Sequence, residues 1–551
     1  RSPSRGLGDV YKRQLRPRSH GRKVYAAAFV GCDALPSGAA RVIVATGAED
    51  GAIVLSEHVL SNAAVPAARG AAEQRGEHVA LLPATSALLG HASGVRALLA
   101  VGAPPALGTC ALLVSGGGLN ALHAWQASWE RAPPAHDADA RGLAVSAGEV
   151  ARAVGEESAA RSNRAESRCL SLAAVPLAAL PPLGPPALSA SATGSAAGGT
   201  SRDPGVLVAA GGSDGVVRLL VLCARAPHGA RAADDDGADG GAHAHGFEPL
   251  CEARPRAGPV LALALGALCT RHAAREPSAP APAPAPAPVA DDAESAAGAH
   301  AILLLLVGCT DGVLRAFDAT AAAAAAAYAG TRAGARASCA ELRCVLAVRV
   351  HAMGVNSMSC APHGACAERA VAAESDVVGA KIPASALCVC CGGDDQAIAL
   401  LELEADQARH AVRVRVARGA RIARAHGAAV RAVWLSRTPA GGRTTRVVSV
   451  GPDQLLHVRS VHWARLPPAR GPADTIEECC ADIIAELEHV DALQDARAPH
   501  AQRLVERRRE AHTAVQHANA LDVVELAGRT LAVVAGEGTE LFELNSYDSD
   551  D

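Results

Sequence analysis

The sequence of 551 residues predicts an all-β fold in which one strand-rich unit is repeated seven times. Three observations lead to this prediction. An apolar three-strand pattern recurs along the chain, its short strands are mostly bounded by Gly, Ser or Asp, and half of the residues are apolar. Short strands with turn residues at their ends are typical of all-β proteins, and the apolar content is sufficient for a large core.

Each copy begins with His or Gly, continues through two apolar strands, turns through small residues that often include Asp, and ends in a third apolar strand. The copies are expected near residues 20–60, 91–126, 168–223, 258–318, 351–404, 426–463 and 513–545. Their spacing is well above the roughly 40–45 residues of a plain blade repeat. Long insertions are therefore expected within and between the copies.

The insertions have distinct compositions. Residues 273–300 are rich in Ala and Pro, and the alternation at Ala279–Pro288 favours extended polyproline II, so this insert is expected to be disordered. Ala321–Ala327 is compatible with a turn or two of helix. Residues 464–512 are interpreted as a helical insert: Thr475–Leu493 has apolar residues at helical spacing, and the charged Arg503–Glu510 is taken as a second helix. Residues 546–551 form an acidic tail.

The first 14 residues are interpreted separately from the rest of the chain. Asp9–Gln14 resembles a translated sequencing adaptor, so residues 1–14 are interpreted as an artefact and residues 15–545 as the folded part. The natural N-terminus and upstream domains are then expected to be missing. Removing these residues takes away four basic and one acidic residue, and the net charge changes from −4 to −7. An acidic chain is a poor stand-alone nucleic-acid binder, although a local basic patch is compatible with it.

Composition excludes several classes of protein. Only 2% of the residues are aromatic, too few for a stacking platform that binds single-stranded nucleic acid. No apolar run reaches the roughly 18 residues that a membrane-spanning helix needs. The 16 cysteines show no disulfide or metal framework, and scattered free cysteines fit a reducing compartment, so a cytoplasmic protein is expected.

Three motifs suggest chemistry but have simpler interpretations. Gly211–Gly215 matches a hydrolase nucleophile elbow with Ser213 as nucleophile, which requires a helix after Gly215; the apolar run Val216–Leu222 predicts a strand there. Cys388 and Cys391 form a lone CxxC, but side chains three apart on a strand point to opposite faces. His243 and His245 lack a third ligand. No catalytic residue, cofactor or metal is therefore predicted.

One basic cluster leaves two interpretations open. Five arginines gather in one segment: Arg413, Arg415, Arg418, Arg421 and Arg424. Arg413 and Arg415 alternate with valines, so both project from one face of a strand, which would be the outer strand of the fifth unit. They either contact RNA phosphates or protect the edge of a solvated strand. Arg507–Arg509 is a weaker candidate, because Glu506 and Glu510 are placed to pair with it on a helix.

The repeated turn resembles the WD-repeat family. In that family an Asp in the turn anchors an upstream His and a Trp of the third strand. The matching positions here are Asp50, Asp214, Asp311, Asp395 and Asp453 for the turn, and His20, His91, His351 and His426 for the histidine. The Trp position holds Ser56, Trp125, Leu220, Phe317, Leu401 and Arg459 in the first six copies. The resemblance implies one seven-bladed β-propeller, and the aspartates are expected to be structural.

A closer resemblance is to the C-terminal part of the WD repeat-containing protein 6 family. Five segments resemble motifs of that family in the same order: Ser115–Trp125, Glu166–Leu172, His351–Ser357, His426–Leu455 and Ala535–Phe542. The resemblance implies a non-catalytic scaffold or adaptor that assists an FtsJ-like methyltransferase in 2′-O-ribose methylation of the wobble nucleotide of tRNA. The methyltransferase would be its partner, and tRNA is a second candidate partner. The alternative is a generic protein-interaction propeller, for example a ubiquitin-ligase or trafficking adaptor, without an RNA role.

Overall fold

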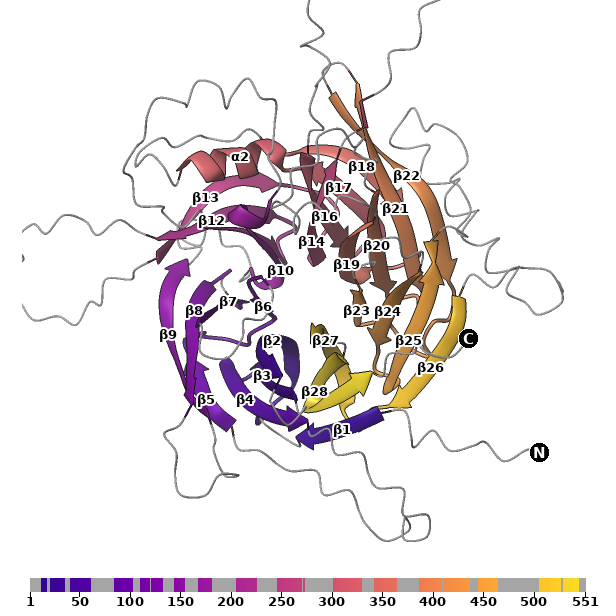
Figure 1. Ribbon diagram of the computed structural model, residues 1–551. Helices are drawn as coiled ribbons and strands as arrows, with labels where there is room; N and C mark the ends of the chain where they lie inside the picture. The colour runs from indigo at the N-terminus through magenta and orange to yellow at the C-terminus, as the bar shows by residue number, and fades with distance from the viewer. Residues whose placement is uncertain are drawn as a thin grey trace, which may run out of the picture.

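The computed structural model shows seven sheets of almost entirely antiparallel strands, arranged as blades around a central axis, as Figure 1 shows. It describes residues 11–16, 20–34, 40–60, 84–102, 110–118, 120–131, 143–153, 167–180, 205–224, 245–269, 271–272, 301–329, 341–363, 386–408, 411–436, 444–463, 505–526 and 529–544. The predicted all-β fold of seven repeated units is confirmed. The blades are numbered one to seven from residue 20 onward.

Six blades contain four consecutive antiparallel strands, with the first strand innermost. The first three blades consist of β2 (Val24–Ala34), β3 (Ala40–Ala48), β4 (Ala52–Leu60) and β5 (Ala84–Leu89); β6 (Ala97–Ala100), β7 (Cys110–Gly116), β8 (Leu122–Arg131) and β9 (Leu143–Ala153); and β10 (Cys169–Pro176), β11 (Val206–Gly212), β12 (Val217–Ala224) and β13 (His245–Ala253). The next three consist of β14 (Val260–Cys269), β16 (Ala301–Cys309), β17 (Val313–Asp318) and β18 (Arg343–Arg349); β19 (Val355–His363), β20 (Ala386–Gly393), β21 (Ile398–Ala408) and β22 (Ala411–Ile422); and β23 (Ala432–Leu435), β24 (Thr444–Val450), β25 (Leu455–His462) and β26 (Val505–His512).

Blade seven is completed by the start of the chain. β27 (Gln516–Leu526) pairs with the first half of the long β28 (Arg529–Leu544), and the second half of β28 pairs with β1 (Tyr11–Arg16). Figure 1 shows β1 at the outside of this blade. β1 includes Tyr11–Gln14 of the segment interpreted as an artefact, and that interpretation stays a prediction.

Two insertions contain described secondary structure, and the sequence predicted one of them correctly. The charged segment taken as a second helix is a strand from Val505, β26, because it pairs along β25 as the outer strand of blade six. The predicted helix at Thr475–Leu493 lies outside the described residues, as does the Ala/Pro-rich insert. The alanine run forms the helix α2 (Thr320–Ala329) after β17, and its buried face (Ala322, Ala323 and Ala326) packs into the apolar core of blades three and four.

The apolar core lies between neighbouring blades. Side chains of blade one, such as Phe29, pack with Leu531 and Leu541 of blade seven, so the ring is sealed where its two ends meet. Between blades one and two, Gly31 lies against Trp129, and a Cβ at Gly31 would overlap the indole ring. β15 (Arg271–His272) and the 3₁₀ turn η2 (Leu177–Ala179) complete the described elements. In this part of the chain, no helix is long and apolar enough to cross a membrane.

Candidate functional site

The turn between the second and third strands of a blade carries the Asp positions of the repeated pattern. In three blades this Asp is followed by Gly51, Gly215 or Gly312 with φ of 75–78°. In two others Gln396 and Gln454 hold φ of 67° and 61°. Positive φ is the conformation that glycine adopts without steric cost. The tight turn directs the Asp side chain back over the end of its blade.

Blades one and six contain the same buried histidine anchor. His20 Nδ1 lies 3.1 Å from Asp50 Oδ2, and its Nε2 lies 2.9 Å from Thr46 Oγ1. In blade six, His426 Nδ1 lies 3.0 Å from Asp453 Oδ2, and its Nε2 lies 2.9 Å from the hydroxyl of Ser449. Both ring nitrogens are therefore satisfied, and the loop that enters each blade is held to the turn at its end.

Blade five keeps the His–Asp pair but lacks the hydroxyl. His351 Nδ1 lies 2.9 Å from Asp395 Oδ1, whose carboxylate also accepts hydrogen bonds from Ala352 N–H and from Arg421. Burial opposes ionisation of Asp395, but the His351 hydrogen bond and these other donors hold its pKa well below its usual range. Cys391 stands where the other anchors have Thr or Ser, and His351 Nε2 has no hydrogen-bond partner.

Blades three and four use an arginine in place of the histidine. Asp214 pairs with Arg218 at 2.7 Å, and Asp311 pairs with Arg315 at 2.6 Å, each arginine lying four residues later on the third strand. These pairs link two parts of one hairpin, whereas the histidine anchors link the preceding loop to the hairpin. The sequence pattern identified the aspartates but not this change of partner.

Blade two lacks the Asp and keeps the Trp. His91 Nε2 lies 2.7 Å from Ser115 Oγ, and Trp125 donates from Nε1 to the same oxygen at 2.8 Å. His123 stacks on Trp125 and pairs with Glu149 at 2.9 Å. Burial, with positive charge nearby, lowers the pKa of His91 to about 3. This imidazole is neutral at physiological pH and acts as a packing and hydrogen-bonding group.

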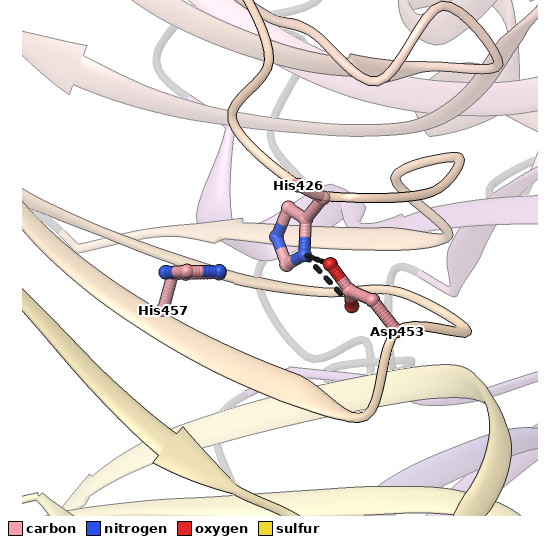
Figure 2. A group of neighbouring side chains, drawn as sticks. All are labelled: His426, Asp453 and His457. Atoms are coloured by element: carbon pink, nitrogen blue, oxygen red, sulfur yellow. Dashed lines mark hydrogen bonds and ion pairs between the residues drawn. The ribbon is translucent and has the colours of Figure 1, made fainter.

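His426, Asp453 and His457 form a cluster with metal-ligand chemistry. Their ligand atoms lie within 4.8 Å of one another, and Figure 2 shows Asp453 directed at His426, with His457 on the adjoining strand. A metal would have to replace hydrogen bonds that His426 already makes through both nitrogens. The buried Arg459 also donates to Ser449 at 3.1 Å, which adds a positive charge beside the cluster. A second cation beside this buried guanidinium is disfavoured by charge repulsion. We assign the cluster to the blade anchor, with Arg459 at the position that Trp125 occupies in blade two.

The nucleophile-elbow motif and the CxxC motif both have roles in the fold rather than in chemistry. Ser213 accepts a hydrogen bond from Arg168 N–H at 2.8 Å, and the strand β12, rather than the helix that a nucleophile elbow requires, follows Gly215. Cys388 and Cys391 lie on the fully buried β20, between neighbouring blades. Burial raises the pKa of the intervening Cys390 thiol to about 12. These thiols pack as small apolar side chains.

The structure divides the five candidate arginines into groups. Four lie on β22, the outer strand of blade five, and Arg424 follows it in an exposed left-handed turn with φ of 49°. Arg415 pairs with Glu404 at 2.5 Å, and Arg418 pairs with Glu402 at 3.3 Å. Arg413 is exposed opposite Asp406 in the strand register.

A bulge at Ala417 keeps Arg418 on the same face as Arg413 and Arg415. Arg421 points elsewhere and belongs to the Asp395 anchor. The exposed face of β22 is therefore a ladder of three arginines (Arg413, Arg415 and Arg418), of which Arg415 and Arg418 pair with carboxylates, rather than a row of five unpaired cations. The second basic candidate, Arg507–Arg509, lies on β26, so the helical pairing expected for it is wrong.

The ring of seven sheets defines a seven-bladed β-propeller, and its repeated His–Asp anchors resemble those of WD repeats. No protein-family model and no curated protein matches the chain. Two crystal structures of Sqt1 from Chaetomium thermophilum are similar to it in fold. One has a TM-score of 0.39 and 13% identity over 97% of this chain and 100% of that chain; the other has a TM-score of 0.40 and 12% identity over 97% and 98%. At these values the likeness carries no argument about function.

Proposed function

We propose that this propeller is a non-catalytic scaffold that assists an FtsJ-like methyltransferase in 2′-O-ribose methylation of the wobble nucleotide of tRNA. The observation that carries the proposal is the shared order of the five segments that resemble the WD repeat-containing protein 6 family. They belong to blades two, three, five, six and seven, so the resemblance runs around most of the ring. The methyltransferase would supply the chemistry, and the scaffold would hold the ribose hydroxyl near the methyl donor.

We propose the β22 ladder as the RNA-contacting surface of this scaffold. Arg413 is exposed, and the side chains of Arg415 and Arg418 remain 55% and 38% exposed despite their acidic partners. Such arginines can turn from a carboxylate to a phosphate, since both accept the planar guanidinium fork. The acidic partners also favour a second candidate function, a protein-interaction propeller without RNA, because Glu402 and Glu404 neutralise part of the ladder.

The first test is a pull-down of the full-length natural protein from native lysate, with proteins and RNA both identified. Recovery of an FtsJ-like methyltransferase together with tRNA supports the proposal. Recovery of other stable partners, without methyltransferase or tRNA, supports the protein-interaction propeller and contradicts the proposal.

The second test measures tRNA affinity against salt concentration for Arg413→Glu combined with Arg415→Glu. Loss of two phosphate contacts should lower the salt slope by about 2. The matched control is Arg254→Glu, because Arg254 is an exposed arginine of another blade that also pairs with a glutamate. Equal affinity and slope for wild type and the double variant would remove RNA contact from β22.

A further inference from the structure

The inner strands of the propeller enclose a central cavity of about 590 Å³. Its wall is formed by β2, β6, β19, β23 and β27, which Figure 1 shows around the axis. A neighbouring section of about 210 Å³ shares Ala27, Leu98 and Leu521 with it, so the two sections adjoin along the axis. Most of the wall is Ala, Leu and Val.

One level of this wall contains a single charge. At the same register position each of the seven inner strands presents one residue opposite the second strand of its blade. These residues are Ala28, Leu99, Ala173, Ala264, Ser359, Trp434 and Asp522. Six are uncharged and the seventh is an aspartate. Both Asp522 and the more exposed Glu525 on the same strand line the cavity.

Asp522 holds its charge without a basic side chain. Its Oδ2 accepts a hydrogen bond from Phe29 N–H at 2.8 Å, and its Oδ1 accepts one from Val523 N–H at 2.9 Å. No salt bridge to Asp522 occurs among the described residues. Burial raises the pKa of this carboxyl group to about 6, so it is mostly ionised at neutral pH. An ionised carboxylate in an apolar wall is costly unless a cation compensates it.

The link between blades does not require this charge. The Asp522–Phe29 hydrogen bond joins blade seven to blade one. Between blades five and six, the neutral Ser359 makes the corresponding link, accepting from Leu435 N–H at 3.1 Å. A hydroxyl or an amide would therefore suffice for ring closure, and the carboxylate needs another explanation.

The lining selects the chemistry of an occupant. Negative carboxylates disfavour phosphates, and two carboxylates on an apolar wall offer a bare divalent cation too few oxygen ligands. An aliphatic stem with a cationic head matches both the wall and the charge. A guanidinium is more weakly hydrated than an ammonium and pairs with a carboxylate through two parallel hydrogen bonds. We propose that the central cavity receives an arginine side chain of a partner protein, with its guanidinium on Asp522. Glu525, on the other face of β27, adds negative charge to the same cavity. This inference does not depend on the role in tRNA methylation.

The test uses fluorescein-labelled Gly-Ser-Arg-Ser-Gly and the same peptide with citrulline, which has the shape of arginine without the charge. Fluorescence anisotropy should show binding of the arginine peptide to the full chain and roughly tenfold or weaker binding of the citrulline peptide. This comparison uses wild-type protein only. No binding of the arginine peptide, or equal binding of the two peptides, would overturn the proposal.

Variants then locate the contact. Asp522→Asn keeps a side-chain oxygen for Phe29 N–H and should weaken arginine-peptide binding by roughly tenfold or more, and Glu525→Gln should weaken it by a few fold. The matched control is Glu537→Gln, an exposed carboxylate at the turn of the same blade, which should leave binding unchanged. Wild-type affinity in Asp522→Asn would overturn the proposal. If that variant does not fold, wild-type affinity in Glu525→Gln would do so.

Discussion

In blades six and three the turn aspartate pairs with different side chains. In blade six, Asp453 reaches the completely buried His426 on the incoming loop, and Ser449 and Arg459 complete the network. In blade three, Asp214 reaches Arg218 of its own hairpin, and both side chains remain about one quarter exposed. The first arrangement holds two segments of chain together, and the second stiffens only one. The Asp of the repeated pattern is therefore expected to contribute different amounts to the free energy of unfolding in different blades.

The largest effect is expected for Asp453→Ala. The substitution leaves the buried His426 without its carboxylate partner, and breaking a buried pair in this way costs about 3 kcal/mol. Urea denaturation followed by circular dichroism measures the change in the free energy of unfolding. A loss below about 1 kcal/mol would show that the buried anchor is no more important than an exposed pair.

The anchors should also make stability depend on pH in the acidic range. The His426 hydrogen bond outweighs burial and lowers the pKa of Asp453, and the His351 hydrogen bond does the same for Asp395. An acid with a lowered folded-state pKa stabilises the fold above its unfolded pKa of about 4, and this contribution is lost as the pH falls. Unfolding midpoints between pH 6 and pH 3 should fall less steeply for Asp453→Asn than for wild type. Parallel curves would contradict this role of Asp453.

A smaller and opposite effect is expected in blade five for Cys391→Ser. Ser449 and Ser115 show that a hydroxyl at this position reaches Nε2 of the anchor histidine in their own blades. In blade five, Nε2 of His351 has no hydrogen-bond partner. A new hydrogen bond is worth about 1 kcal/mol, so this variant should be more stable than wild type. Cys390→Ser is the control, because it places a hydroxyl in the neighbouring buried position and should be destabilising. Destabilisation by both variants would show that Cys391 is retained for packing.

The smallest effect is expected for Asp214→Ala. The Asp214–Arg218 pair is partly exposed, and such pairs contribute about 0.2–1 kcal/mol. The same denaturation measurement applies, with added salt as a second variable, because screening weakens exposed pairs more than buried ones. A loss as large as that of Asp453→Ala would remove the difference between the two kinds of blade.

Parts of the candidate site followed from pattern alone. The turn aspartates, His20, His351 and His426 were found because a tight turn and its anchor recur at fixed positions. The arginines of β22 were found through the alternation at Arg413 and Arg415. The pairing of Asp214 and Asp311 with arginines, and the attachment of Arg421 to Asp395, were missed. The bulge at Ala417 changes which face the later residues occupy, and no sequence signal marks it.

The sequence by itself determined the fold class, the number of blades and the three apolar strands of six of them, because period-2 apolar runs and Asp-Gly turns are local properties of the chain. In blade seven the second and third expected strands form one continuous strand, β28. Only the tertiary structure decided the outer strands, because such strands are fixed by hydrogen bonds to a neighbouring strand rather than by their own periodicity. One of them, β26, was predicted to be a helix and pairs with β25. The tertiary structure also decided the environment of Asp522, an ordinary aspartate in an apolar run of the sequence. Closing seven blades into a ring places that carboxylate in the wall of an apolar cavity, where we propose that it receives a guanidinium.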